Sequence, residues 1–237
     1  QRIQQQAASS LKDLLMTEAN IKIQQDNILG SDLKINGISG SNVKILIDGV
    51  PVIGRLNGSI DLNQINLSNV HRIEIIDGPM SSVYGSDALG GVINIISKEP
   101  DCPRLEADGN GYWESIGTYN FDLTTRYSIS DFNLQLNCGR NLFQGYDEDN
   151  SKRDKQWNPK EQYFANFQAV YGGEDFKIRY SGQLFDEYIL NRGTPRAPYN
   201  ESAFDDKYKT LRLTNSLFAN GRIGNSSAFE LTGAYSY

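Results

Sequence analysis

The sequence predicts a small α+β domain with a mixed sheet over residues 1–100, followed by antiparallel strands of an incomplete transmembrane β-barrel over residues 101–237. The placement of aromatic residues indicates the division, because only Tyr84 of the 25 aromatics (13 Tyr, 10 Phe and 2 Trp) lies in the first 100 residues. Apolar and polar residues alternate with a period of two along long stretches of the second part, which is typical of strands. A charged, proline-containing stretch at 98–101 marks the expected boundary between the two domains.

Composition narrows the class of protein. The net charge is −6, with 23 basic and 29 acidic residues well mixed, so no basic patch favours a nucleic-acid partner. The sequence contains no run of about 20 apolar residues, so we expect no transmembrane helix. This absence does not exclude a membrane protein, because a transmembrane β-barrel needs only short alternating strands. Residue 1 begins in mid-pattern with no visible signal peptide, so we expect either a mature chain or a trimmed piece.

The first domain begins with a predicted helix over residues 7–16, which Ser9 or Ser10 can cap. Its apolar stripe consists of Leu11, Leu14 and Leu15. The elements expected next are a strand at 21–23, a polar loop at 24–31, a strand at 33–35, a Gly- and Ser-rich turn at 36–42, a strand at 43–47, a hairpin turn at 48–49, a returning strand at 50–53 and a helical turn within 60–69.

Residues 70–97 form the most informative stretch of the first domain. A strand of period two at 70–76 is broken at 77–79 and followed by a compact polar turn that holds Tyr84. Gly90 and Gly91 then precede an apolar strand at 92–96 that we expect to be buried on both faces. Two glycines at this point predict a positive φ or a close backbone approach.

The sequence argues against a phosphate-binding loop, a histidine site, a disulfide and a catalytic nucleophile–base pair. The glycine spacing at 85–90 resembles a phosphate loop, but Gly91 stands where the loop needs a lysine. His71 is the only histidine and lies within a strand, so it offers neither a catalytic base nor a metal site. Cys102 and Cys138 fall on non-adjacent predicted strands, and we expect two unpaired thiols. With no nucleophile–base pair, the chain is predicted not to be an enzyme, which counts against a soluble β-rich hydrolase.

The second domain is predicted to hold about seven strands joined by connections that alternate in length. The clearest strands are 118–129, 132–138, 175–185, 208–219 and 227–237. The predicted short turns are 130–131, 172–174 and 221–225, and the long polar loops are 144–160 and 186–207. Short turns on one side and long loops on the other are typical of outer-membrane barrels. Seven strands leave two open edges that lipid would not tolerate, so we interpret the sheet as part of a larger barrel.

Two segments carry a family resemblance. Residues 70–97, with R-I-E-I-I-D-G-P at 72–79 and V-Y-G-S-D-A-L-G-G-V-I-N-I-I-S at 83–97, resemble the end of the plug domain of TonB-dependent outer-membrane receptors. Residues 45–51, I-L-I-D-G-V-P, resemble the middle hairpin of the same plug. Within the family the plug looks most similar to cobalamin receptors, with haem and siderophore receptors close behind. Receptors of this kind use about 22 strands, so residues 101–237 correspond to the first part of the barrel.

The resemblance implies an energy-coupled receptor and transporter in the outer membrane of a Gram-negative bacterium. The expected ligand is a scarce nutrient such as cobalamin, haem or a ferric siderophore. The expected partners are this small molecule, the lipid bilayer, a candidate surface lipoprotein and TonB, whose contact segment would precede residue 1. A surface binding module without transport activity is the alternative interpretation.

The resemblance also assigns candidate site residues. Plug loops that face the ligand correspond here to residues 24–31 and 53–59, and the turn after residue 79 is a further candidate. The ligand-binding candidates are Asn27, Arg55, Leu56, Asn57, Tyr84 and Ser86, with solvated loop residues and a packing role for Tyr84 as alternatives. Arg72 and Glu74 share a strand face and are candidates for plug–barrel contacts. Two departures from the family, Asn36 and Asp77, put its usual charge network in question.

The first long loop contains an acidic run that could bind calcium. Asp147, Glu148 and Asp149 offer carboxylates, but an EF-hand loop needs Gly at its sixth position and Glu at its twelfth. Counted from Asp147 those positions are Lys152 and Asn158. We therefore predict a solvated acidic loop and no cofactor, with Ca²⁺ as the alternative.

Overall fold

The computed structural model describes residues 11–18, 20–26, 30–39, 42–54, 60–67, 69–79, 81–85, 88–100, 104–149, 151–173, 175–198, 203–223 and 227–237. The chain divides into two compact units, residues 1–99 and 100–237. Within the described ranges, no helix is long and apolar enough to cross a membrane.

The first unit opens with helix α2 (Leu11–Leu15) and a three-stranded antiparallel sheet. Its strands are β1 (Ile21–Asp26), β2 (Gly30–Ile35) and β3 (Ile38–Ser39). The predicted polar loop at 24–31 was therefore too long, because Gln24 pairs with Asp32 and Asp26 pairs with Gly30. Backbone groups form a ladder whatever the polarity of their side chains, so the hairpin continues past the end of the apolar pattern.

A second sheet of the first unit is mixed, in the order β5-β4-β7-β6. Its strands are β4 (Val43–Ile47), β5 (Val50–Pro51), β6 (Val70–Asp77) and β7 (Gly91–Ser97). Strands β4 and β7 are parallel, and the other pairs are antiparallel. The predicted hairpin turn is confirmed, since Asp48 and Gly49 have φ values of 51° and 80°. The described residues of this unit also contain two short helices, η3 (Leu62–Gln64) and α3 (Ser81–Tyr84).

The core of the first unit joins its helix to both sheets. Leu11 and Leu15 of α2 are fully buried, as the predicted leucine stripe requires. They belong to one cluster with Ile35 of β2 and with Ile93 and Ile95 of β7. Burying an aliphatic side chain of this size stabilises a fold by about 1.5–3 kcal/mol. This cluster therefore holds the helix and the two sheets of the first unit together.

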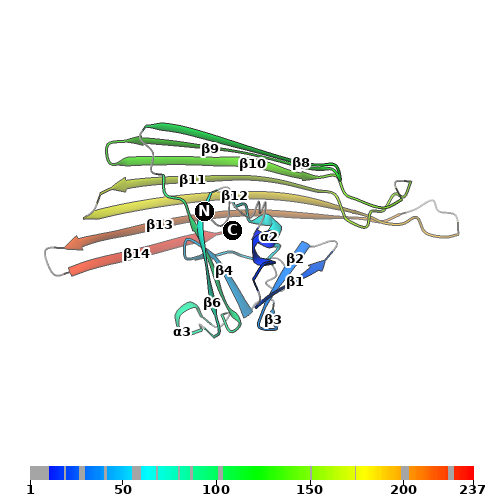
Figure 1. Ribbon diagram of the computed structural model, residues 1–237, viewed down its shortest axis with the longest axis horizontal. Helices are drawn as coiled ribbons and strands as arrows, with labels where there is room; N and C mark the ends of the chain where they lie inside the picture. The colour runs from blue at the N-terminus through cyan, green and yellow to red at the C-terminus, as the bar shows by residue number, and fades with distance from the viewer. Residues whose placement is uncertain are drawn as a thin grey trace. The chain divides into compact units, whose positions relative to one another are not determined.

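The second unit is a single antiparallel sheet of seven strands in the order β14-β13-β12-β11-β10-β9-β8, which run side by side in Figure 1. The strands are β8 (Leu105–Glu114), β9 (Thr118–Ile129), β10 (Phe132–Phe143), β11 (Lys160–Gly172), β12 (Phe176–Arg192), β13 (Asp205–Ile223) and β14 (Ser227–Ser236). Each strand pairs with its sequence neighbour, and the sheet does not close on itself. The predicted fold class is confirmed.

The strands of the second unit run further than the sequence suggested. Strand β12 continues to Arg192, which pairs with Asp205, so the predicted loop at 186–207 shrinks to 193–204. The sequence analysis missed this extension because polar residues such as Glu187 interrupt the alternation of apolar and polar side chains. Glu187 is nevertheless only 1% exposed, and its carboxylate accepts a hydrogen bond from Gln162 Nε2 at 2.7 Å. The long loops 144–159 and 193–204 leave the same end of the sheet (Figure 1).

Candidate functional site

Along strands β9 to β12, the apolar face of the sheet is exposed and much of its polar face is buried. Large side chains on one face are exposed, among them Phe121, Leu136 and Phe167. Eight polar side chains on the other face are less than 9% exposed: Thr124, Arg126, Gln135, Asn137, Gln162, Gln168, Ser181 and Glu187. A few apolar residues, including Phe185 and Ile189, share that polar face. This is the reverse of a soluble sandwich, whose inner face is apolar.

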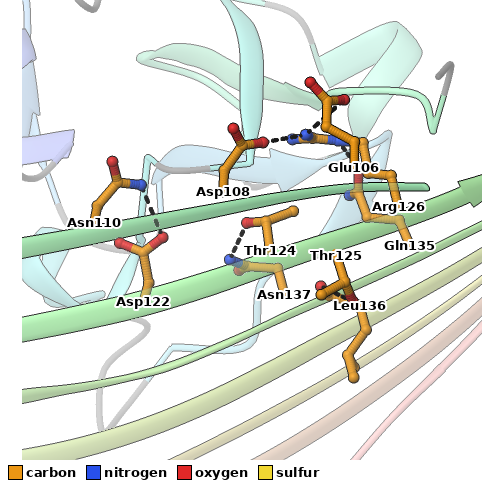
Figure 2. A network of polar contacts seen from close by, with 10 residues as sticks. All are labelled: Glu106, Asp108, Asn110, Asp122, Thr124, Thr125, Arg126, Gln135, Leu136 and Asn137. Carbon is orange, nitrogen blue, oxygen red and sulfur yellow. Dashed lines mark hydrogen bonds and ion pairs between the residues drawn. The ribbon is translucent and has the colours of Figure 1, made fainter. Parts of the chain in front are cut away.

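Arg126 is the centre of a charged cluster on the polar face of β8, β9 and β10 (Figure 2). Its Nη1 lies 2.5 Å from Asp108 Oδ2 and 3.5 Å from Glu106 Oε2. Its Nε donates a hydrogen bond to Gln135 Oε1 at 2.9 Å. The Arg126 side chain is 9% exposed, whereas both carboxylates are about half exposed. Because one arginine faces two acids, this patch carries excess negative charge.

Amide and hydroxyl groups continue the polar network across the strands. Asn137 Nδ2 donates to Thr124 Oγ1 at 2.8 Å, and Asn166 Nδ2 donates to Asn137 Oδ1 at 3.1 Å. Asn110 Nδ2 donates to Asp122 Oδ2 at 3.1 Å (Figure 2). Buried polar groups of this kind need partners, since an unpaired one costs about 1–3 kcal/mol. Gln168 Oε1 is buried with no hydrogen-bond partner in the part of the chain that the structure describes.

The chemistry of this face is recognition by hydrogen bonding and charge. Around Arg126, this face presents amide donors and acceptors, the half-exposed carboxylates of Glu106 and Asp108, and the Arg126 guanidinium. The alternation along 118–129 and 132–138 predicted strands with one polar face, but the sequence did not single out Arg126, Gln135 or Asn137. These residues could have been found from one sequence signal: amides and hydroxyls recur at alternate positions in strands that are otherwise rich in aromatic residues.

In the first unit, the predicted pair Arg72 and Glu74 forms an ion pair along β6. Arg72 Nε donates to Glu74 Oε1 at 2.9 Å, and Asn94 Nδ2 of β7 donates to Glu74 Oε2 at 3.3 Å. The hydrogen bond from Arg72 is the main cause that lowers the pKa of Glu74, against the opposing effect of desolvation. Both side chains are substantially exposed, so the pair adds little to stability. Their proposed role toward the barrel stays a prediction.

Of the ligand-binding candidates, only Tyr84 lies within the described residues. Asn27, Arg55, Leu56, Asn57 and Ser86 lie outside them. The Tyr84 side chain packs against the buried cluster of Leu46, Ala88 and Val92, and its backbone carbonyl accepts a hydrogen bond from Lys44 Nζ at 2.7 Å. These contacts give Tyr84 a structural role in holding the turn after β6.

The two departures from the family pattern have local functions in this chain. Asn36 has a φ of 51° and precedes Gly37 at the β2–β3 turn, a conformation that asparagine tolerates better than most residues. Asp77 accepts a hydrogen bond from Asn20 Nδ2 at 3.2 Å. Both residues therefore fix turns and strand ends of the first unit.

The acidic run in the first long loop is organised by the backbone. Asp147 is buried, and its carboxylate accepts hydrogen bonds from the amides of Asp149 at 2.8 Å and Gln156 at 3.0 Å. These bonds lower the pKa of Asp147, with the Asp149 amide the largest cause. Asp149 in turn accepts from the backbone and hydroxyl of Ser151. Among the described residues, no group of three or more His, Cys, Asp or Glu side chains is placed to hold a metal ion.

The two cysteines were predicted to be unpaired thiols. Cys138 is a free thiol near the middle of β10. Cys102 lies outside the described residues.

Comparison with known proteins identifies the first unit. Residues 1–92 match the family model of the TonB-dependent receptor plug domain. The fold is also similar to three solved structures: the copper transporter OprC (TM-score 0.73, 16% identity), the FrpB iron transporter from Neisseria meningitidis (0.74, 14%) and the ferric-catecholate import receptor Fiu from E. coli K12 (0.71, 20%). These alignments cover 96–99% of this chain and 35–38% of the three proteins.

The chain therefore has the fold of a plug domain followed by part of a receptor barrel. It spans about a third of the length of the structures it matches. The predicted likeness to TonB-dependent receptors is confirmed, whereas none of these matches singles out the cobalamin branch.

Proposed function

We propose that the chain is the plug and the first barrel strands of a TonB-dependent receptor that imports a scarce nutrient across a Gram-negative outer membrane. The observation that carries this proposal is the match of residues 1–92 to the plug model. The reversed polarity of the seven-stranded sheet supports it, because an apolar outer face suits lipid and a polar inner face suits a wet lumen. Binding and passage of a ligand would need no covalent chemistry from the chain.

The proposed ligand class is a metal chelate or a related scarce cofactor: a ferric siderophore, haem or cobalamin. Several similar structures are named for copper, iron, ferric catecholate or ferric yersiniabactin. We therefore put iron chelates first in a ligand screen, ahead of cobalamin. Asn27, Arg55, Leu56, Asn57, Tyr84 and Ser86 are the proposed ligand contacts, and Arg72 and Glu74 are the proposed contacts with the barrel.

The test is uptake of radiolabelled ferric siderophores, haemin and cobalamin by cells that express the whole receptor, in matched strains with and without TonB. We expect one ligand to bind in both strains and to accumulate inside only with TonB. Binding with no TonB-dependent accumulation would reject transport. Failure of every ligand to bind would reject the proposed ligand class.

A second candidate function is that of a surface receptor for a protein toxin. One similar structure is the FpvAI–pyocin S2 complex, at a TM-score of 0.73 and 13% identity. In the same cells, protection from a bacteriocin on deletion of the receptor, with no nutrient bound, would favour this alternative.

A further inference from the structure

A carboxamide side chain, that of Asn215 in β13, lies on the apolar face of the seven-stranded sheet. In the register of the sheet, Phe167 of β11 is opposite Gly182 of β12, and Gly182 is opposite Asn215. Residues directly opposite each other in antiparallel strands point to the same face. Asn215 therefore points the same way as Phe167, which is one of the exposed apolar side chains.

Asn215 is at the centre of the apolar run of its strand. On the same face of β13, Leu211 and Leu213 precede it, and Leu217 and Ala219 follow it. The three leucines are 39–57% exposed. Residues 211–219 have about the length of a tilted transmembrane strand, so under the proposed function they are the lipid-facing part of β13. An amide at the centre of this run lies where hydrocarbon offers no hydrogen-bond partner.

The sheet itself uses only one end of the Asn215 amide. The Tyr180 hydroxyl of β12 donates a hydrogen bond to Asn215 Oδ1 at 2.7 Å. The Asn215 side chain forms no other hydrogen bond within the described residues. A carboxamide has two N–H donors, and both of these are therefore left without a partner in the sheet. In hydrocarbon, unpaired donors of this kind are destabilising.

The surface beside Asn215 permits close approach by another backbone. Gly182 is opposite Asn215 in β12, and Gly233 of β14 is opposite Leu217. Nothing lies within 4 Å of the Cβ position of Gly233, so the space above this residue is open. Membrane-spanning helices associate through small residues that let backbones approach and through amides that hydrogen-bond between them. The surface of β12 to β14 combines the same two features on strands.

We propose that Asn215 is the centre of an interface between two copies of this protein within the membrane. Lipid chains have no acceptor for its N–H groups, so a lipid occupant leaves them unpaired. A carboxamide carries both a donor and an acceptor, which makes it complementary to a second carboxamide. A two-fold axis beside β13 would place Asn215 of one copy against Asn215 of the other. Each Oδ1 can then accept from the other copy and from Tyr180 at the same time, because it has two lone pairs.

This inference rests on the proposed function in one respect only, the location of the sheet in a membrane. The test compares self-association of the full-length protein and two variants by sedimentation equilibrium in density-matched detergent. Asn215→Leu removes the amide and leaves an apolar side chain of the same branching. We expect the dissociation constant of the dimer to rise about fivefold or more, as for amide hydrogen bonds between membrane helices.

Thr125→Val is the matched control for the loss of a polar group. Thr125 of β9 is on the same face, because it is opposite Leu136, which is opposite Phe167. This variant should leave the dissociation constant unchanged. Asn215→Leu places an apolar group in lipid, so it should not impair assembly of the barrel, and circular dichroism checks that the sheet is intact in each variant.

Cysteine cross-linking tests the same interface in the native membrane. Leu217→Cys, two positions from Asn215 on the same face, is made together with Cys138→Ser, which removes the thiol of β10. Oxidation should then yield a cross-linked dimer of the chain. Leu136→Cys, on the same face of β10, is the control and should yield none.

The proposal is overturned if the parent is monomeric in detergent and Leu217→Cys gives no dimer in the membrane. It is also overturned if Asn215→Leu and Thr125→Val raise the dissociation constant equally, or if position 217 cross-links to a different protein. Solubility of the full-length protein without detergent would overturn both this proposal and the membrane location. Nutrient uptake is not a readout here, so a failure of transport would be seen separately.

Discussion

At residue 91 the chain needs a glycine, for two separate reasons. Gly91 has a φ of 139°, in a region that residues with a Cβ rarely adopt. A Cβ there would lie 2.6 Å from the backbone oxygen of Ile76, on the neighbouring strand β6. The sequence predicted a positive φ or a close approach at Gly90 or Gly91, and both occur at Gly91. A pair of glycines before a buried strand predicts a positive φ or a close backbone approach, because few other structural requirements call for two glycines at that place.

Gly91→Val should therefore lower the free energy of unfolding of the plug by about 1 kcal/mol or more. The measurement is a urea or thermal unfolding curve of the full-length protein, followed in the first unit. Gly49→Ala is the matched control, because Gly49 also has a positive φ but nothing lies within 4 Å of its Cβ position. An unchanged midpoint for Gly91→Val would show that the β6–β7 edge relaxes around a side chain.

Asp147 illustrates a residue whose role could not be read from the sequence. The acidic run suggested either solvent or calcium, whereas the structure aims both carboxylate oxygens of Asp147 at backbone amides of its own loop. No sequence pattern reports which amide a loop will turn toward a carboxylate, since this depends on where strands β10 and β11 end.

The lowered pKa of Asp147 gives its contribution a definite pH dependence. The folded loop favours the charged carboxylate, so the stabilisation is present above the ordinary aspartate pKa, near 3.8, and is lost as pH falls through the lowered value. Asp147→Asn should reproduce the acid form at neutral pH. Hydrogen exchange in peptides covering 144–159 should become faster, while Glu148→Gln, at the exposed neighbour, should leave it unchanged. Equal exchange in both variants would refute the role assigned to Asp147.

At the scale of an element, strand β12 shows that the alternation of apolar and polar residues predicts the faces of a strand better than its length. A strand was predicted at 175–185, and in β12 the alternate positions Phe176, Ile178, Tyr180 and Leu184 share a face. Beyond residue 185 the sequence reads as a polar loop, yet β12 continues to Arg192 because β13 offers a backbone partner at each position. Strand length is set by the neighbouring strand as well as by the strand itself, and a single-strand pattern omits that information.

The two faces of β12 should respond oppositely to a new charge. If the apolar face meets lipid, an arginine at mid-bilayer costs about 2–4 kcal/mol there and little on the lumen face. Ile178→Arg should therefore impair assembly of the whole receptor in the membrane. Gln183→Arg, on the other face, should not. Ser181 lies on the same face as Gln183, but it is only 7% exposed. An arginine at Ser181 would therefore be overpacked, so Gln183 is the better test position.

Spin labels give a readout for β12 that does not depend on assembly yield. A label at 178 should be relaxed by oxygen, which concentrates in lipid, and a label at 183 by a water-soluble nickel reagent. The reverse pattern would mean that the faces are inverted. Equal exposure of both labels to water would contradict a membrane location for the sheet.

At the scale of the molecule, the aromatic residues are distributed unequally between the two units. The plug unit buries aliphatic side chains in its own core, as the cluster around Leu11, Ile35 and Ile93 shows. The sheet unit displays its aromatics outward, as Phe121 and Tyr127 do. Which strands lie next to one another followed from short connections, because consecutive antiparallel strands usually pair. The polar contacts that join strands, such as those of Arg126, could not be predicted, since they depend on register.

The segment between the two units should be the preferred site of proteolysis when one of them is unfolded. The Lys98 amide donates to the Asn69 carbonyl at 2.9 Å in the first unit, and the Arg104 carbonyl accepts from the Ser128 amide at 2.8 Å in the second. The chain passes from one unit to the other between these anchors. A unit that unfolds releases its own anchor, and trypsin can then cleave after Lys98 or Arg104.

Digestion of the full-length protein across a urea titration should thus yield a cut at 98–104 at the first unfolding step, before the unit that is still folded is degraded. Lys98→Gln should remove the first of the two products and leave the second as an internal control. A single transition, in which both units are degraded together with no cut in this segment, would mean that they unfold as one body and that the boundary at residue 99 has no energetic meaning.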